Sequence, residues 1–111
     1  MKILYSFRES KNFTKRVTSL LSDDEYATFQ WRLTQFPKGG DDIPKGGGIR
    51  KLRCQIKDRG KRGGGRVIYY LAISKHEIFM LDIYAKNEKV DLSSVELKLL
   101  RNLVEEWLKN G

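Results

Sequence analysis

The sequence predicts a small α+β domain in which one antiparallel sheet is packed by helices. Residues 66–73 and 78–84 are almost continuously apolar, β-branched or aromatic, as is typical of strands buried on both faces. Segments with helical periodicity stand before and after these two runs, so helices can cover the sheet. The 111 residues, 40% of them hydrophobic, suffice for one core but not for two. We therefore expect a single domain over residues 1–111.

The first third of the chain predicts a strand followed by two helices. Residues 2–7 alternate apolar and polar side chains, which indicates a short strand. A first helix is indicated by apolar residues at helical spacing, namely Phe13, Val17, Leu20 and Leu21. Ser22 and Glu25 have the spacing of a capping box, so a second helix should begin there and end before Pro37.

The remaining elements complete the order β-α-α-β-β-β-α. Residues 37–48 contain both prolines and five glycines, which predicts an irregular connection before a strand over about residues 49–56. Residues 57–65 form a second glycine-rich stretch. The two buried strands then form a central hairpin that turns at residues 74–77. Ser93 and Glu96 offer another capping box for a last helix, whose apolar stripe is Leu100, Leu103, Val104, Trp107 and Leu108.

Positive charge is concentrated in one part of the chain. The net charge is +8, and residues 50–66 carry +7 of it, with one acid and eight basic side chains: Arg50, Lys51, Arg53, Lys57, Arg59, Lys61, Arg62 and Arg66. Such a run is often only a solvated surface. Here glycines interrupt the run and a buried strand adjoins it, which favours a site for a polyanion. Arg66 stands at the start of a central strand and should be held most rigidly.

The sequence lacks the residues or the spacing that several common kinds of site require. Lys61 follows a glycine but precedes Arg62, so the phosphate-binding loop motif is absent, and neither triple glycine fits a dinucleotide fingerprint. The single histidine, His76, is expected in the hairpin turn, and Cys54 is the single cysteine. We therefore expect neither a metal nor another cofactor. No apolar segment is long enough to span a membrane, and we expect a cytoplasmic protein without a membrane partner.

The hairpin places candidate catalytic residues together. Residues near Tyr84 should lie opposite residues near Arg66, with Lys86 on the same side as Tyr84. Lys51 and Arg53 on the neighbouring strand add cations. Such a group can promote cleavage of RNA by the 2′-hydroxyl of the RNA itself. Arginine stabilises the extra negative charge on the phosphate oxygens, and a lysine or tyrosine transfers protons.

Two alternatives for Tyr84 remain open at this point. Its ring can stack on a base, or it can merely seal the end of the strand. If its hydroxyl transfers protons, it competes with Lys86 for the role of general base.

Three segments together resemble the RelE/HigB superfamily of toxins from bacterial type II toxin–antitoxin pairs, on the HigB side. The segments are residues 47–53 (GGIRKLR), 60–70 (GKRGGGRVIYY) and 83–93 (IYAKNEKVDLS). Their order and spacing carry the resemblance, which extends over nearly the whole chain. Many RelE-type relatives have a catalytic tyrosine just beyond the last strand, whereas this chain has residues 90–93 (VDLS) there. Tyr84 is the nearest candidate replacement.

The resemblance implies a ribosome-dependent endoribonuclease that cuts messenger RNA in the decoding site and so inhibits translation. It also implies a cognate antitoxin, often with a helix-turn-helix domain as in HigA. The toxin would then contact operator DNA only through this antitoxin. By position, Lys51, Arg53, Arg66 and Lys86 match the family's basic site residues. The other basic residues are expected to bind RNA or the ribosome: Arg50, Lys57, Arg59, Lys61 and Arg62. The alternative function is a non-enzymatic RNA- or ribosome-binding module that uses the same cations.

Overall fold

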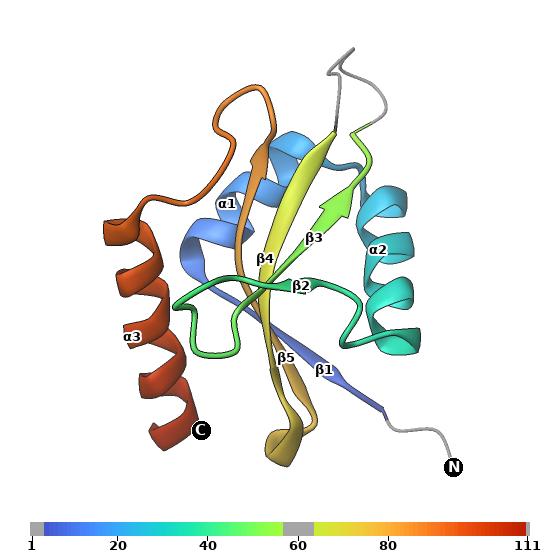
Figure 1. Cartoon of the computed structure of the whole chain (residues 1–111). Helices are drawn as coiled ribbons and strands as arrows, with labels where there is room; N and C mark the ends of the chain where they lie inside the picture. Colours follow the sequence, from blue (N-terminus) through green and yellow to red (C-terminus); the bar gives the residue numbers. More distant parts are fainter. Residues whose placement is uncertain (1–3, 57–63, 111) are drawn as a thin grey trace.

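The structure contains the predicted kind of domain, three helices around one sheet (Figure 1). The computed structural model of the chain describes residues 4–56 and 64–110. Its elements are β1 (Ser6–Glu9), α1 (Lys11–Leu20), α2 (Asp23–Gln35), β2 (Asp41–Asp42), β3 (Arg50–Cys54), β4 (Gly65–Ala72), the 3-10 turn η1 (Ile73–Lys75), β5 (Glu77–Ala85) and α3 (Ser94–Asn110). The α+β class and the order of the seven expected elements are confirmed. The short β2 lies inside the connection that was expected to be irregular.

The sheet has the strand order β1-β5-β4-β3-β2, with the predicted hairpin of β4 and β5 at its centre. It is antiparallel except at one edge, where β1 runs parallel to β5. No hairpin links β1 to β5, so turn geometry does not fix its direction. The strand also begins later than predicted, at Ser6, and leads directly into the helix α1.

Side chains that cap the helices explain where each helix begins. Both predicted capping boxes are present, because Ser22 and Glu25 exchange hydrogen bonds, as do Ser93 and Glu96. Ser10 caps α1 by accepting a hydrogen bond from the Phe13 amide, and its hydroxyl also donates to the Leu81 carbonyl at 2.8 Å. This second bond ties the start of α1 to the central strand β5.

Two apolar clusters lie on the two faces of the sheet, with α2 on one side and α3 on the other (Figure 1). The first cluster joins α1 and α2 to the sheet and includes Phe13, Leu33, Val67, Tyr69 and Met80. The second joins α3 to the sheet and includes Ile68, Phe79, Leu81, Tyr84 and Val104. Adjacent strand residues therefore enter different clusters, which confirms that the central strands are buried on both faces.

Candidate functional site

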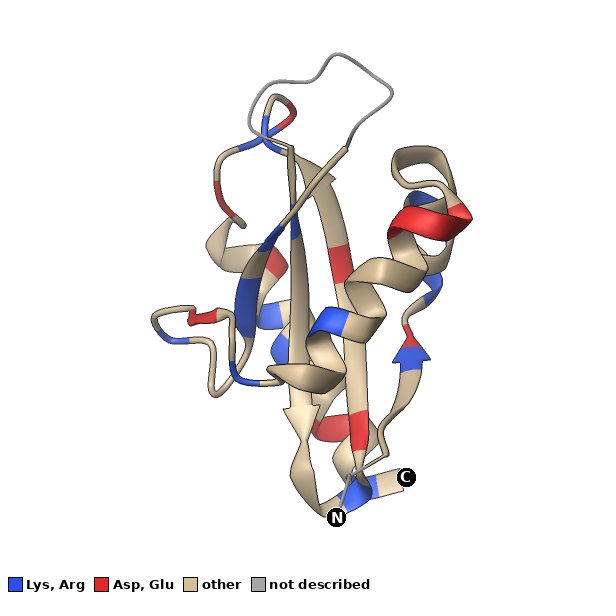
Figure 2. Cartoon of the chain, turned by 90° about the vertical axis from the view of Figure 1, so that its right-hand side faces the viewer, with Lys and Arg blue, Asp and Glu red and all other residues tan. Residues whose placement is uncertain are grey.

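The cations of β3 and β4 meet in one row across the sheet. Arg53 pairs directly with Arg66, and Arg66 pairs with Tyr84, as the hairpin predicted. Leu52 and Cys54 pack against the α1–α2 cluster. Because strand side chains alternate, Arg53 lies on the opposite face, the face that α3 partly covers. Figure 2 shows most of β3 in the colour of lysine and arginine.

Lys51 lies on the same face, two residues before Arg53. Its Nζ is 2.7 Å from a carboxylate oxygen of Asp91, which belongs to the connection between β5 and α3. The hydrogen bond from Lys51 holds the pKa of Asp91 below its usual value. Lys51 and Asp91 are among the residues that line a cleft of about 450 Å³ between this connection and the loop around β2. The ion pair therefore spans a cleft beside the arginine row.

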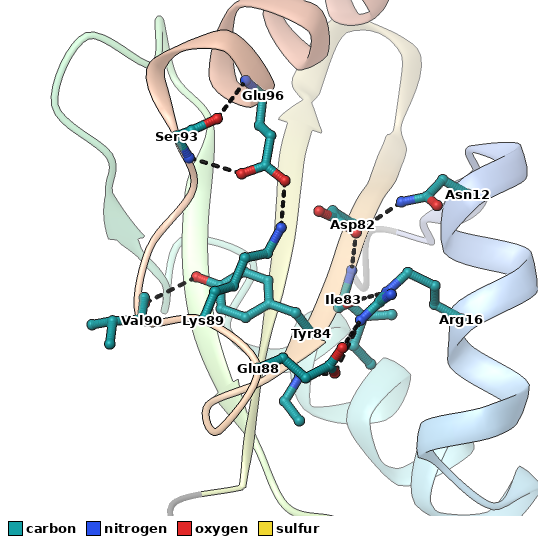
Figure 3. Close-up of polar contacts among 11 residues, drawn as sticks. Asn12, Arg16, Asp82, Ile83, Tyr84, Glu88, Lys89, Val90, Ser93 and Glu96 are labelled. Carbon is teal, nitrogen blue, oxygen red and sulfur yellow. Dashed lines mark hydrogen bonds and ion pairs between the residues drawn. The ribbon is translucent and has the colours of Figure 1, made fainter.

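Tyr84 is buried in the α3-side cluster, with no exposed side-chain surface. Its hydroxyl donates a long hydrogen bond of 3.4 Å to the Val90 carbonyl, and the Nζ of Lys89 lies 5.0 Å from its ring centroid (Figure 3). Burial raises the pKa of Tyr84 to about 12, so the hydroxyl stays protonated at neutral pH. In this structure the ring offers no exposed surface on which a base could stack, and the role of Tyr84 stays a prediction. The alternative, that Tyr84 seals the end of the strand, agrees with the structure.

Two lysines follow β5, and their surroundings differ. Lys89 forms an ion pair of 2.5 Å with Glu96 in the first turn of α3. Lys86 is exposed, and its backbone amide donates to the Gly64 carbonyl at 3.0 Å. Gly64 lies two residues before Arg66, so this bond places Lys86 near the row of arginines. Of these two lysines, Lys86 is the one whose ammonium group can meet a ligand.

Arg50 lies on the other face of the sheet from Lys51 and Arg53, and its expected role in RNA binding stays a prediction. It pairs with Tyr69, on the face that α1 and α2 cover. Its guanidinium donates to the carbonyls of Lys38 at 3.2 Å and Gly40 at 2.7 Å. Arg50 therefore holds the connection between α2 and β2.

The other four expected RNA contacts, Lys57, Arg59, Lys61 and Arg62, lie outside the described residues, so their role stays a prediction. Of the glycines that follow Arg62, Gly64 and Gly65 are described. Gly64 has φ +60°, and a side chain there would place a Cβ atom 2.4 Å from the Cys54 carbonyl oxygen. At this position glycine permits close contact between β3 and β4.

A polar network that sequence patterns do not reveal supports this end of the sheet. Arg16 of α1 binds Glu88 beyond β5, and Asn12 of α1 binds the buried carboxylate of Asp82 at 3.0 Å (Figure 3). Burial raises the pKa of Asp82. The partners in these pairs are 72 and 70 residues apart. Contacts between residues so distant in the chain leave no periodic pattern that could have revealed them.

Among residues 4–56 and 64–110, no cluster of three or more His, Cys, Asp or Glu side chains could hold a metal ion. No helix in the same ranges is long and apolar enough to cross a membrane. Cys54 is buried, and burial raises its pKa to about 11, so its thiol is not an activated nucleophile at neutral pH. His76 is exposed in the turn before β5, as predicted.

Comparisons with known proteins agree with this fold. Residues 9–110 match the model of a protein family described as the RelE toxin of the RelE/RelB toxin–antitoxin system. The isolated RelE toxin of E. coli is similar in structure, with a TM-score of 0.54 at 14% sequence identity over 89% of this chain and 98% of that one. A double arginine-to-alanine mutant of E. coli RelE in the free state gives a TM-score of 0.56 at 11% identity, over 78% of this chain and 87% of that one. The chain belongs to the RelE toxin family.

Proposed function

We propose that this toxin is a ribosome-dependent endoribonuclease of the HigB-like branch, which cleaves messenger RNA in the decoding site. The observation that carries the proposal is the direct pairing of Arg53 with Arg66. Like charges opposite each other in a sheet destabilise it. An anion bound across the pair relieves the repulsion, and the planar guanidinium groups suit the oxygens of a phosphodiester.

The site supplies most of what cleavage of RNA by its own 2′-hydroxyl requires. Arg66 is half-buried on a central strand, so it can stabilise the negative charge that develops on the phosphate oxygens. Lys86 is exposed beside it and can transfer protons to or from the reacting oxygens. The raised pKa and the burial of Tyr84 argue against this tyrosine as the base. These two cations can act without a bound metal ion.

Two features support dependence on the ribosome: the described part of the site has no histidine, and the chain resembles HigB-like toxins. The described part of the site contains no histidine that could transfer protons near neutral pH, since His76 lies at the opposite end of β5. Substrate positioning must then supply much of the rate enhancement. A ribosome that holds messenger RNA in one conformation provides such positioning. Lys51 and Arg53 would bind the RNA backbone in this complex.

The family description supports a protein antitoxin as the physiological partner. For the HigB-like branch we propose a helix-turn-helix antitoxin of the HigA type, so that operator DNA is bound through the antitoxin and not through this chain. The reading frame next to the gene tests this directly. A neighbouring gene for an antitoxin without a helix-turn-helix domain would count against assignment to the HigB-like branch.

The decisive experiment compares messenger RNA that is being translated with the same RNA free in solution. Purified protein is added to both, and RNA fragments are mapped by primer extension. We expect cleavage within the decoding site of translating ribosomes and intact free RNA. If translation stops while messenger RNA stays intact, the alternative of a non-enzymatic ribosome-binding module is correct.

A further inference from the structure

The turn that follows β5 is closed by hydrogen bonds on both sides of Lys86. The amides of Glu88 and Lys89 donate to the Ala85 carbonyl at 2.9 and 3.4 Å. In return, the Glu88 carboxylate accepts a hydrogen bond of 3.0 Å from the Ala85 amide. Lys86 thus lies inside a closed turn whose geometry depends on one carboxylate.

Arg16 of α1 fixes that carboxylate to the rest of the protein. Its Nη2 donates to both oxygens of Glu88, at 3.0 and 2.9 Å, and its Nε donates to the Ile83 carbonyl at 2.7 Å. The guanidinium therefore binds the last part of β5 and the turn at the same time (Figure 3). We name this set of contacts between Arg16, Glu88 and Ile83 the clamp.

The opposite side of the turn is tied to the strand that carries Arg66. The amide of Lys86 donates to the Gly64 carbonyl at 3.0 Å, and Arg66 follows two residues later. The backbone of Lys86 is consequently held between the clamp on one side and the beginning of β4 on the other. Its side chain remains exposed.

We propose that Arg16 and Glu88 are positioning residues, which hold Lys86 at the distance from Arg66 that RNA cleavage requires. This inference rests on the proposed function and names residues that support its site. An ion pair whose side chains are 33% and 40% exposed contributes little to folding. Arg16 binds the Glu88 carboxylate through Nη2 and the Ile83 carbonyl through Nε, so two points fix the orientation of its guanidinium. Catalytic groups need such support, because small displacements cost large factors in rate.

The first test is a set of variants assayed for single-turnover cleavage at saturating concentrations of translating ribosomes. Arg16→Met removes the donors but keeps most of the apolar stem, and we expect cleavage to slow by about tenfold or more with ribosome affinity unchanged. Arg16→Lys should restore part of the rate. Lys15→Met makes the same change of charge at an exposed neighbouring position of α1 and should cleave like the wild type.

A second arm asks whether Arg16 acts through Lys86. In a Lys86→Ala background, Arg16→Met should cause no further loss of cleavage rate, because the group that it positions is gone. An equal loss in both backgrounds would overturn the proposal, as would a wild-type rate in the Arg16→Met variant. Circular dichroism confirms that each variant is folded.

A third arm needs no enzymatic activity. Amide hydrogen exchange should show Lys86 and Ala85 protected in the wild type and less protected in Arg16→Met, while Val67 within β4 keeps its protection. Unchanged protection of Lys86 in the variant would show that the clamp does not hold the turn, and would overturn the inference. If protection is lost in Arg16→Met but the wild-type protein never cleaves RNA, the role of the clamp is supported and the proposed function is overturned instead.

Discussion

The two faces of the sheet use the same strands for different purposes. Toward α1 and α2, Leu52, Val67 and Tyr69 pack into an apolar cluster. Toward α3, the intervening residues divide between apolar packing, as at Ile68, and cations, as at Arg66. Because side chains alternate along a strand, residues that stabilise the fold and residues that contact a ligand can be immediate neighbours in sequence. Function and stability should therefore be separable at adjacent positions.

The largest effect is expected at Arg66. Arg66→Ala should reduce cleavage on the ribosome by about 10²–10³-fold, because it removes the cation that we propose stabilises the charge that develops on phosphate. The midpoint of thermal unfolding should stay near that of the wild type, since the side chain is only half-buried. Growth arrest on expression and primer extension measure the first effect, and circular dichroism the second. If the variant remains toxic, Arg66 is not part of the catalytic site.

The adjacent residue should behave in the opposite way. Val67 has no exposed surface and packs toward α1 and α2. Val67→Ala should lower the free energy of unfolding by about 2 kcal/mol, from lost burial and the cavity that remains. The cleavage rate per folded molecule should be unchanged. Urea denaturation measures the free energy of unfolding, and the cleavage rate is corrected for the fraction of protein that is folded. A selective loss of cleavage rate would contradict the division between the two faces.

Features that depend on short sequence patterns could be predicted from the sequence. The helix starts at Ser22 and Ser93 follow from capping boxes, and the hairpin follows from two apolar runs joined by a short turn. The pairing of Arg66 with Tyr84 was predicted because hairpin length sets register, although a β-bulge near Ile68 shifts part of it. These features depend on residues close together in the chain.

Features that depend on packing could not be predicted in this way. Alternation places Tyr84 on the correct face but does not reveal that Lys89 and residues 90–93 cover it. In the same way, composition counts Arg50 among the cations, while tertiary structure turns it toward the Gly40 carbonyl. The parallel direction of β1 and the clamp at Glu88 depend on contacts between distant residues.

A smaller effect is expected where the two kinds of surface meet, at Asp91. Asp91→Asn removes the charge that engages Lys51, so the lysine becomes available to phosphate. RNA affinity should rise by up to about fivefold, since exposed ion pairs contribute about 0.2–1 kcal/mol. The gain should shrink at high salt. Fluorescence anisotropy with a short RNA measures it.

The matched control for Asp91→Asn is Glu106→Gln on the exposed side of α3, which makes the same change of net charge away from the cleft. This control variant should bind RNA nearly as the wild type does. If both substitutions raise affinity equally, the effect comes from net charge and the contact between Lys51 and Asp91 has no specific role.

The smallest effect is expected at the Tyr84 hydroxyl, which contrasts with the Tyr69 hydroxyl on the other face of the sheet. The hydroxyl of Tyr69 accepts from the Gly40 amide and donates to the Pro37 carbonyl, both at 2.9 Å, so Tyr69→Phe should cost about 1–3 kcal/mol of stability. The Tyr84 hydroxyl has one long bond, to the carbonyl of the exposed residue Val90. Tyr84→Phe should thus change stability by less than about 1 kcal/mol and cleavage by less than about twofold. A tenfold loss of cleavage in a stable Tyr84→Phe protein would return this hydroxyl to the chemistry and displace Lys86.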